Sequence, residues 1–271
     1  MRSRLQMGVH MPADSPALSR FLSRLLRRST LTRQEQNAIL GLSGLADEYR
    51  GNYDIISPGE TVDHCCLVAH GIAARYDQMA DGKRQITAFH IEGDMCDLHS
   101  LACPTAAWGI IAMSRASVLK VPHVQLRRLI ADYPAIALAF WRDSIADASI
   151  LAKWVGNLGR RGAQARVAHL LCEMGLRMEM AGLGSREHFW LDVTQGNLAD
   201  ALGLTSVHIN RTLQSLRATG LVRTQGRTIY VDDWARLAKL AEFDPAYLLV
   251  GRAPKLGLGD EQVPAVAYGT T

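Results

Sequence analysis

The sequence lacks the features that mark exported or membrane-spanning proteins. Its longest uncharged stretch, residues 98–114, is too short for a bilayer and is interrupted by Pro104 and Gly109. Arg2 and Arg4 are not followed by an apolar signal core. The five cysteines are an odd number without a framework spacing, which favours reduced thiols. We therefore expect a cytoplasmic protein without a membrane partner.

Catalytic patterns are also missing. None of the nine histidines forms a His-x-His pair, which a cupin-type metal enzyme would usually need. No phosphate-binding loop and no pattern of serine, histidine and aspartate typical of hydrolases stands out. We expect that the protein is not an enzyme.

Positive charge is concentrated in one part of the chain. The net charge is only +4, but residues 194–227 contain four arginines and a single acid, Asp200. Such a basic segment indicates nucleic acid as a partner, although a solvated surface would have the same composition.

In the first half of the chain, the residue pattern changes from helical to strand-like at about residue 50. Residues 17–27 place five apolar side chains on one helical face, and Thr32 with Glu35 forms a capping box before a short helix. From residue 50 to 122, turn signals recur about every eleven residues, which predicts an antiparallel sandwich or barrel. An irregular α+β domain is the alternative.

After Pro134 the pattern predicts one long helix. Apolar residues recur at alternating spacings of three and four, which is the heptad stripe of a coiled coil. The members of this stripe are Leu138, Trp141, Ile145, Ala148, Ala152 and Val155. Because Phe140, Leu151, Trp154 and Leu158 supply a second apolar face, one face can pack on the sandwich and the other on a partner chain. A helix packed only on its own sheet is the alternative.

Residues 198–222, LADALGLTSVHINRTLQSLRATGLV, predict a helix-turn-helix. Ala199, Gly203 and Ile209 supply the small residue at the crossing, the glycine of the turn and the apolar anchor. Thr194 and Thr205 are placed to cap the two helices. A hairpin at VRTQGRTIYV, turning at residues 225–226, adds a wing. A plain helical hairpin would not need His208, Asn210 and Arg211 on its second helix.

These segments together resemble the Crp/Fnr family of bacterial transcription regulators. The resemblance covers roughly residues 20–243, and its most specific part is TQGNLADALGLTSVHINRTLQSLRATGLV at 194–222. The fold that it implies is α+β: an N-terminal antiparallel β-roll like a cyclic-nucleotide-binding jelly roll, a long dimerisation helix and a C-terminal winged helix-turn-helix. We expect a mobile leader at 1–16, the β-roll at 17–133, the dimerisation helix at 134–159, the DNA-binding domain at 160–245 and a flexible tail at 246–271.

The resemblance also implies which residues contact double-stranded DNA. The base-reading positions of the family match Ser206, Val207 and Arg211, and arginine can bond the O6 and N7 of guanine. Valine cannot accept a hydrogen bond from cytosine, though it can pack on a thymine methyl group. The full expected set of DNA contacts is Thr194, Gln195, Thr205, Ser206, His208, Asn210, Arg211 and Arg227. Thr194, Gln195, Thr205 and Arg227 are expected on phosphates.

No effector follows from the sequence. The cyclic-nucleotide branch of the family uses an arginine–serine pair, whereas residues 103–109 here read CPTAAWG and no arginine lies between Arg84 and Arg115. We therefore do not expect cyclic AMP. The iron–sulfur branch needs an N-terminal cysteine cluster, but the first cysteine is Cys65, so we do not expect a cluster either. The cofactor, if there is one, stays unknown.

Cys96, His99 and Cys103 form a C-x2-H-x3-C set that could bind a metal or haem or respond to oxidation. The alternative, which we favour, is that the two cysteines are buried strand residues and His99 lies in a surface turn, so that no metal is bound.

The resulting prediction is a homodimeric, sequence-specific transcription regulator that binds an inverted repeat and contacts RNA polymerase. A ligand- or redox-sensing dimeric module with weak or degenerate DNA binding is the alternative.

Overall fold

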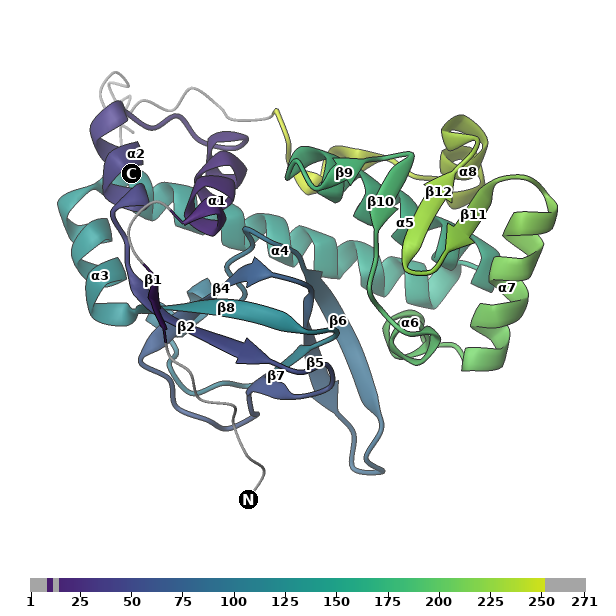
Figure 1. The fold of residues 1–271 in the computed structure, drawn as a ribbon, viewed down its shortest axis with the longest axis horizontal. Coiled ribbons are helices and arrows are strands. Elements are labelled where there is room, and N and C mark those ends of the chain that lie inside the picture. The colour runs from purple at the N-terminus through teal and green to yellow at the C-terminus, as the bar shows by residue number, and fades with distance from the viewer. Residues whose placement is uncertain (1–8, 12–14, 252–271) are drawn as a thin grey trace, which may run out of the picture.

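The computed structural model describes residues 9–11 and 15–251. Figure 1 shows a β-roll, the long helix α4 beside it and a smaller C-terminal domain at the far end of α4. The helices are α1 Pro16–Leu26, α2 Arg33–Leu40, α3 His123–Asp132, α4 Pro134–Arg160, α5 Ala163–Met180, α6 Gln195–Leu202, α7 Ser206–Ala218 and α8 Trp234–Ala241, with short 3-10 turns η1 Leu98–Leu101 and η2 Pro245–Leu248.

The strands pair into antiparallel sheets. The strands are β1 Val9–Met11, β2 Gly44–Tyr49, β3 Asp54–Ile56, β4 His64–His70, β5 Ala73–Gln78, β6 Arg84–His90, β7 Gly109–Ala112, β8 Ala116–Pro122, β9 Gly184–Ser185, β10 His188–Trp190, β11 Val222–Gln225 and β12 Thr228–Val231. The orders β1-β2-β8-β4 and β3-β7-β5-β6 form the two sheets of the roll, and β11-β12-β10-β9 forms the wing sheet. The predicted antiparallel roll is thus present.

Strand β4 is buried on both of its faces, because the roll packs against helices on one side. Cys66 and Val68 point into the core between the two sheets. Cys65 and Leu67 point the other way, into a core shared with α1, α2, α3 and the start of α4. The helices therefore extend the roll into a third layer.

Helix α4 has two different faces. Its inner face, which includes Phe140, Asp143, Ile150 and Trp154, is buried against the rest of the chain. The predicted heptad stripe lies on the opposite face: Trp141 is 67%, Ile145 46% and Val155 62% exposed. Of the other members, Ala148 and Ala152 are exposed and Leu138 is partly exposed. The single chain thus leaves an apolar stripe in contact with solvent.

Two expected boundaries differ in the structure. Residues 9–11, placed in the mobile leader, form β1, which pairs with β2. Residues 246–248, at the start of the expected flexible tail, belong to η2, and the side chains of Tyr247 and Leu248 are buried. Residues 1–8, 12–14 and 252–271 of those two segments lie outside the described residues.

Among the described residues, no helix combines the length and the apolarity that crossing a membrane would require.

Candidate nucleic-acid interface

Helices α6 and α7 form the predicted helix-turn-helix. Thr194 caps α6, Thr205 caps α7, and Gly203 ends α6 with a left-handed φ of 60°. A side chain at position 203 would be strained at this φ, and its Cβ would lie 3.3 Å from a methyl carbon of Leu158. The turn is therefore built from local signals that the sequence displays.

The inner faces of the two helices are buried. Ile209 and Leu216 have no measurable exposure, and Ala199 is 6% exposed. Leu198, Leu202 and Leu213 complete this core. Because the apolar side chains fix how α7 lies on α6, most polar side chains of α7 remain on its outer surface, whereas Thr212 is buried and Asn210 is half-buried.

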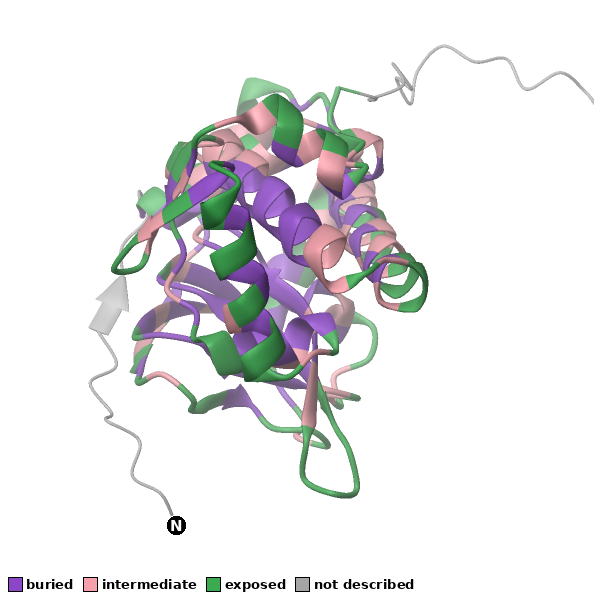
Figure 2. Ribbon diagram, turned by 90° about the vertical axis from the view of Figure 1, so that its right-hand side faces the viewer, coloured by how far each residue is buried: buried purple, intermediate pink, exposed green. Residues whose placement is uncertain are grey.

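The outer face of α7 presents side chains that can reach a nucleic acid. Ser206, Val207, His208 and Arg211 are exposed, and Val207 is 59% exposed. Figure 2 shows this side of the molecule, with the outer surface of α7 exposed and its inner surface buried. Sequence reasoning missed Gln214, which is also exposed and lies three residues beyond Arg211 on the same face. The 3.6-residue period alone could have found it.

Five of the expected contact residues form hydrogen bonds within the protein, including Thr205, whose hydroxyl accepts the His208 N–H at 3.2 Å. The Thr194 hydroxyl donates to Asn197 Oδ1 at 2.7 Å and accepts from its backbone N–H at 3.1 Å. Asn210 donates from Nδ2 to Gln195 Oε1 at 3.3 Å. Arg227 donates to the carbonyl of Val193 at 3.1 Å. These side chains position the starts of α6 and α7 and the wing.

The wing is a hairpin of β11 and β12. The register pairs Gln225 with Thr228, so the turn residues are 226 and 227, one residue later than expected. Arg223 forms an ion pair with Asp232 at 2.7 Å and lies over the ring of Tyr230. Arg217 at the end of α7 donates to the hydroxyl of Thr224 at 2.5 Å. The wing is therefore tied to the end of α7.

The interior of the roll is filled by its own side chains. The His99 ring lies 4.8 Å from that of Trp108, and the Arg75 guanidinium lies 5.2 Å from the same indole. A cavity of about 10 Å³ lies beside His99 and Trp108 and is lined partly by Asp97. Burial raises the pKa of Asp97 to about 7, although its carboxylate accepts the Cys66 N–H at 2.6 Å.

The cysteine–histidine set does not gather around one point. Cys96 is buried in the roll, whereas Cys103 is exposed. Within the described ranges there is no group of three or more histidine, cysteine, aspartate or glutamate side chains that could hold a metal ion. The expectation of two buried strand residues was wrong, because Cys96 is buried but lies in a turn and Cys103 follows η1 in an exposed loop. His99, expected in a surface turn, lies in η1 and is half-buried.

Each half of the chain matches a known family model. The family model of the cyclic nucleotide-binding domain matches residues 46–133, and that of the Crp-like helix-turn-helix domain matches residues 165–240. Together they span more than half of the chain. The chain belongs to the Crp/Fnr family of transcriptional regulators.

Individual Crp/Fnr proteins are similar over most of the chain. The anaerobic regulatory protein of Haemophilus influenzae is 23% identical over 219 residues, covering 81% of this chain and 85% of its own. The transcriptional activator protein FnrL of Cereibacter sphaeroides is 26% identical, with coverages of 72% and 80%. The structure of FixK2 from Bradyrhizobium japonicum superimposes with a TM-score of 0.66 at 28% identity, covering 72% of this chain and 96% of that one.

The residues in the roll do not fit the cyclic nucleotide that the name of its family model implies. The Arg75 guanidinium lies 5.2 Å from the Trp108 ring and donates to the Thr87 hydroxyl at 3.2 Å, and its Nη2 has no partner among the described residues. Arg75 does not line the cavity beside Trp108, whereas the buried Asp97 carboxyl does, and an ionised carboxylate there would repel a cyclic phosphate. A space of about 10 Å³ holds at most a water molecule. No step of the function is therefore assigned to a nucleotide.

Proposed function

We propose that this Crp/Fnr protein acts as a homodimer that binds an inverted-repeat DNA site and regulates transcription there. In this arrangement each protomer inserts α7 into a major groove, with the two helices roughly 34–36 Å apart. The observation that carries the proposal is the exposed outer face of α7, with Arg211 and its neighbours presented beside the start of α6.

The exposed stripe on α4 supports the dimer. Trp141, Ile145 and Val155 are large apolar side chains that the single chain leaves in solvent. Their heptad spacing suits a second copy of the same helix, because knobs from one helix then enter holes of the other. Pairing along α4 also gives the two-fold symmetry that an inverted repeat requires.

The residues of the interface divide by role. Arg211 reads a guanine, Val207 packs on a thymine methyl group, and Ser206 and His208 bond neighbouring base edges. The first backbone N–H groups of α6 and α7, with Gln195 and Thr205, bind phosphates. Thr194, Asn210 and Arg227 act mainly by holding these groups in place, since each already donates within the protein, whereas the bonds of Gln195 and Thr205 use them as acceptors and leave their amide and hydroxyl donors for a phosphate.

Regulation then follows from where the site lies. A dimer bound beside a promoter either contacts RNA polymerase in the cytoplasm or blocks its access. FnrL of Cereibacter sphaeroides carries the name transcriptional activator protein, which supports activation by contact with polymerase over blocking as the form of regulation for this chain.

The decisive experiment is selection from a random duplex library with purified protein that is reduced, chelated and free of nucleotide. We expect an inverted repeat to be recovered. Recovery of unrelated sequences with weak, salt-sensitive binding would contradict the proposal and favour a module with degenerate DNA binding. The recovered repeat also provides the operator for every test below.

A charge in the α4 stripe tests the dimer. Ile145→Glu should give monomers and lower operator affinity by at least about 100-fold, because a monomer holds only one half-site. Val124→Glu is the matched control, since Val124 is also an exposed apolar residue on a helix, 66% exposed on α3. Analytical ultracentrifugation and operator titration provide the readouts. If the Ile145→Glu protein remains dimeric at low concentration, the α4 stripe is not the dimer interface.

A further inference from the structure

Two segments outside the matched family domains meet in the structure. Helix α1 precedes the region matched at 46–133, and residues 241–251 follow the region matched at 165–240. Arg28, in the turn that follows α1, donates from Nε and Nη2 to the carbonyl oxygen of Leu248, at 3.1 and 2.8 Å. The N–H of Gly251 donates to the carbonyl oxygen of Arg27 at 3.4 Å. The start of the roll domain is thus bonded to the end of the DNA-binding domain.

One arginine of α1 connects the roll to α4. Arg24 donates to Asp94, which follows β6, and to Asp143 and Asp147 of α4, each at 2.7 Å. Its side chain is only 13% exposed. Asp143 is also paired with Arg28 at 3.2 Å. Three separate elements are therefore held by charged groups that solvent hardly reaches.

Asp94 extends the connection into the DNA-binding domain. Its second oxygen accepts a hydrogen bond at 2.7 Å from Arg177 of α5, whose side chain is 5% exposed. Arg177 also donates to the carbonyl oxygen of Phe89 in β6 at 2.8 Å. Burial acts to raise the pKa of Asp94, but Arg24 and Arg177 outweigh it and lower that pKa below its ordinary value. Asp94 is thus a charged bridge between α1 and α5.

Glu173 of α5 anchors a second set of contacts. It accepts from Trp154 Nε1 of α4 at 2.9 Å and from the Tyr247 hydroxyl of η2 at 2.8 Å. Near the other end of the junction, Arg161 donates to the carbonyl oxygen of Glu242 at 3.1 Å. Residues beyond α8 therefore pack back onto α4.

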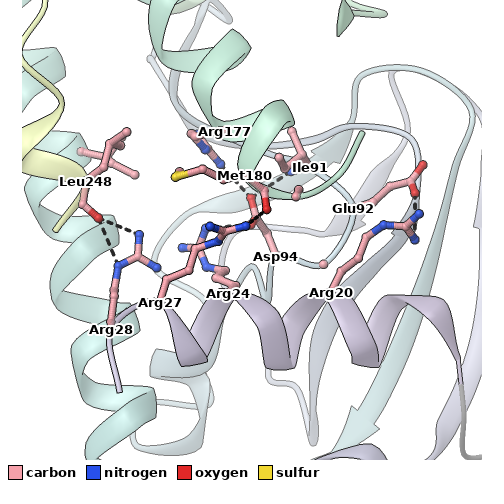
Figure 3. A pocket seen from close by; sticks show the side chains of 13 residues that line it. Arg20, Arg24, Arg27, Arg28, Ile91, Glu92, Asp94, Arg177, Met180 and Leu248 are labelled. Carbon is pink, nitrogen blue, oxygen red and sulfur yellow. Dashed lines mark hydrogen bonds and ion pairs between the residues drawn. The ribbon is translucent and has the colours of Figure 1, made fainter. Parts of the chain in front are cut away.

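We name this set the interdomain clamp. Its members are Arg24, Arg28, Asp94, Asp143, Asp147, Glu173 and Arg177. Figure 3 shows the side chains of Arg24, Asp94 and Arg177 converging between α1 and α5, with Arg28 reaching Leu248. The cavity among the arginines measures about 30 Å³, enough for one or two waters but not for a nucleotide. The arginines are thus engaged in joining protein segments.

The clamp acts at the point where the two domains would otherwise turn. Only Arg161 and Gly162 separate α4 from α5, and both have extended backbone dihedrals. Rotation of the DNA-binding domain about this break would separate Arg177 from Asp94 and leave buried charges without partners, which is strongly unfavourable. A directional, buried network therefore opposes rotation more sharply than an apolar contact, which can slide.

We propose that the interdomain clamp contains positioning residues for DNA recognition, which fix the DNA-binding domain on α4 and so set the distance between the two α7 helices of the dimer. DNA binding then requires no effector, and the spacing between half-sites is strict. The inference rests on the proposed function, because the two reading helices must belong to one DNA-bound dimer.

The test measures tolerance to spacing. The selected operator is prepared with its central spacer shortened and lengthened by one and two base pairs. Wild-type protein should lose at least about tenfold in affinity for each base pair of change. Arg28→Met and Asp94→Asn should bind the best spacer more weakly yet bind all five spacers with similar affinity. Arg28→Lys keeps a cation beside Asp143 and should recover part of the preference.

A matched control separates positioning from stability. Arg186→Gln removes an arginine that pairs with Glu179 inside the DNA-binding domain, away from the clamp. It should keep the wild-type spacing profile even if it lowers the free energy of unfolding. Clamp variants that fold, dimerise and keep the wild-type profile overturn the inference. So does a wild-type protein that accepts every spacer, although that result would leave the proposed function intact.

A second measurement does not depend on DNA. Spin labels are attached through Val124→Cys on α3 and Ala218→Cys on α7, with Cys103→Ser removing the exposed cysteine. Labelled chain is mixed with excess unlabelled chain, so that each dimer carries one labelled protomer. We expect a single narrow distance distribution by pulsed electron paramagnetic resonance, which broadens in Arg28→Met. A broad wild-type distribution overturns the clamp, whether or not any operator is found.

Discussion

The roll and the helix-turn-helix treat polar side chains in opposite ways. On α7, Ser206, His208 and Arg211 lie on the outer surface with the apolar side chains beneath them. In the roll, the polar atoms of Asp97 and Trp108 face inward, and Asp97 Oδ2 and Trp108 Nε1 lack a partner among the described residues. One region presents its hydrogen-bonding capacity, whereas the other encloses it. The comparison indicates that the expected DNA-binding face of α7 is exposed to solvent, whereas the interior of the roll, where an effector would be expected to bind, is enclosed.

The largest effect should come from the enclosed carboxyl group. Burial raises the Asp97 pKa to about 7, against about 4 in an unfolded chain. The folded state therefore retains a proton that the unfolded state releases, and Asp97 lowers wild-type stability by up to about 4 kcal/mol as the pH rises from 4 to 7, with no further change above that. Asp97→Asn stays neutral, so its stability relative to wild type should rise across this window.

Urea unfolding of wild type and Asp97→Asn at pH 4.5 and pH 8 checks this sign. A stability difference between the two proteins that is the same at both pH values would contradict the raised pKa of Asp97. Asp77→Asn serves as the control, since Asp77 is an exposed carboxylate on β5 of the same roll.

A smaller effect is expected at the open surface. Arg211→Ala should cost about 1–3 kcal/mol of operator binding and relax the selection of one base in each half-site. The same change at Arg186, on the other side of the domain, should leave base selection intact. Repeating the library selection with both variants measures this directly. An unchanged base preference after Arg211→Ala would show that Arg211 does not read a base.

The smallest effect, no change at all, is expected from adding cyclic AMP. Cyclic AMP at millimolar concentration should change neither the tryptophan fluorescence of the protein nor its affinity for the operator, because Trp108, His99 and Arg75 fill the roll interior. Fluorescence titration and operator binding in the same buffer provide the check. A tighter operator complex in the presence of cyclic AMP would show that the roll opens.

The two regions also differ in how far the sequence could predict them. Thr194, Gly203 and Ile209 lie in one short stretch, residues 194–209, so their spacing predicted the caps, the turn and the core of the helix-turn-helix. The clamp could not be found in this way, because Arg24 meets partners 70, 119 and 123 residues away. Pairings at such separations depend on how the helices pack, and no local pattern records them.

Within the candidate interface the same limit applies to single residues. The sequence could place Asn210 and Arg227 on the correct helix and wing, but not show that each is bonded to the protein. Trp108 also gave no signal, since nothing local indicates that its indole lies between His99 and Arg75.

The two faces of α4 have a consequence for how such a regulator would respond to its own amount. Asp143 and Trp154 belong to the face that each chain buries by itself, whereas Trp141 and Ile145 belong to the face left for a second copy. A lone chain can therefore be folded and clamped before it pairs. Below the dissociation constant of the dimer, the concentration of pairs grows with the square of the number of chains. Doubling synthesis then raises the supply of DNA-binding dimers about fourfold, so the rate of expression of this gene can by itself act as the signal.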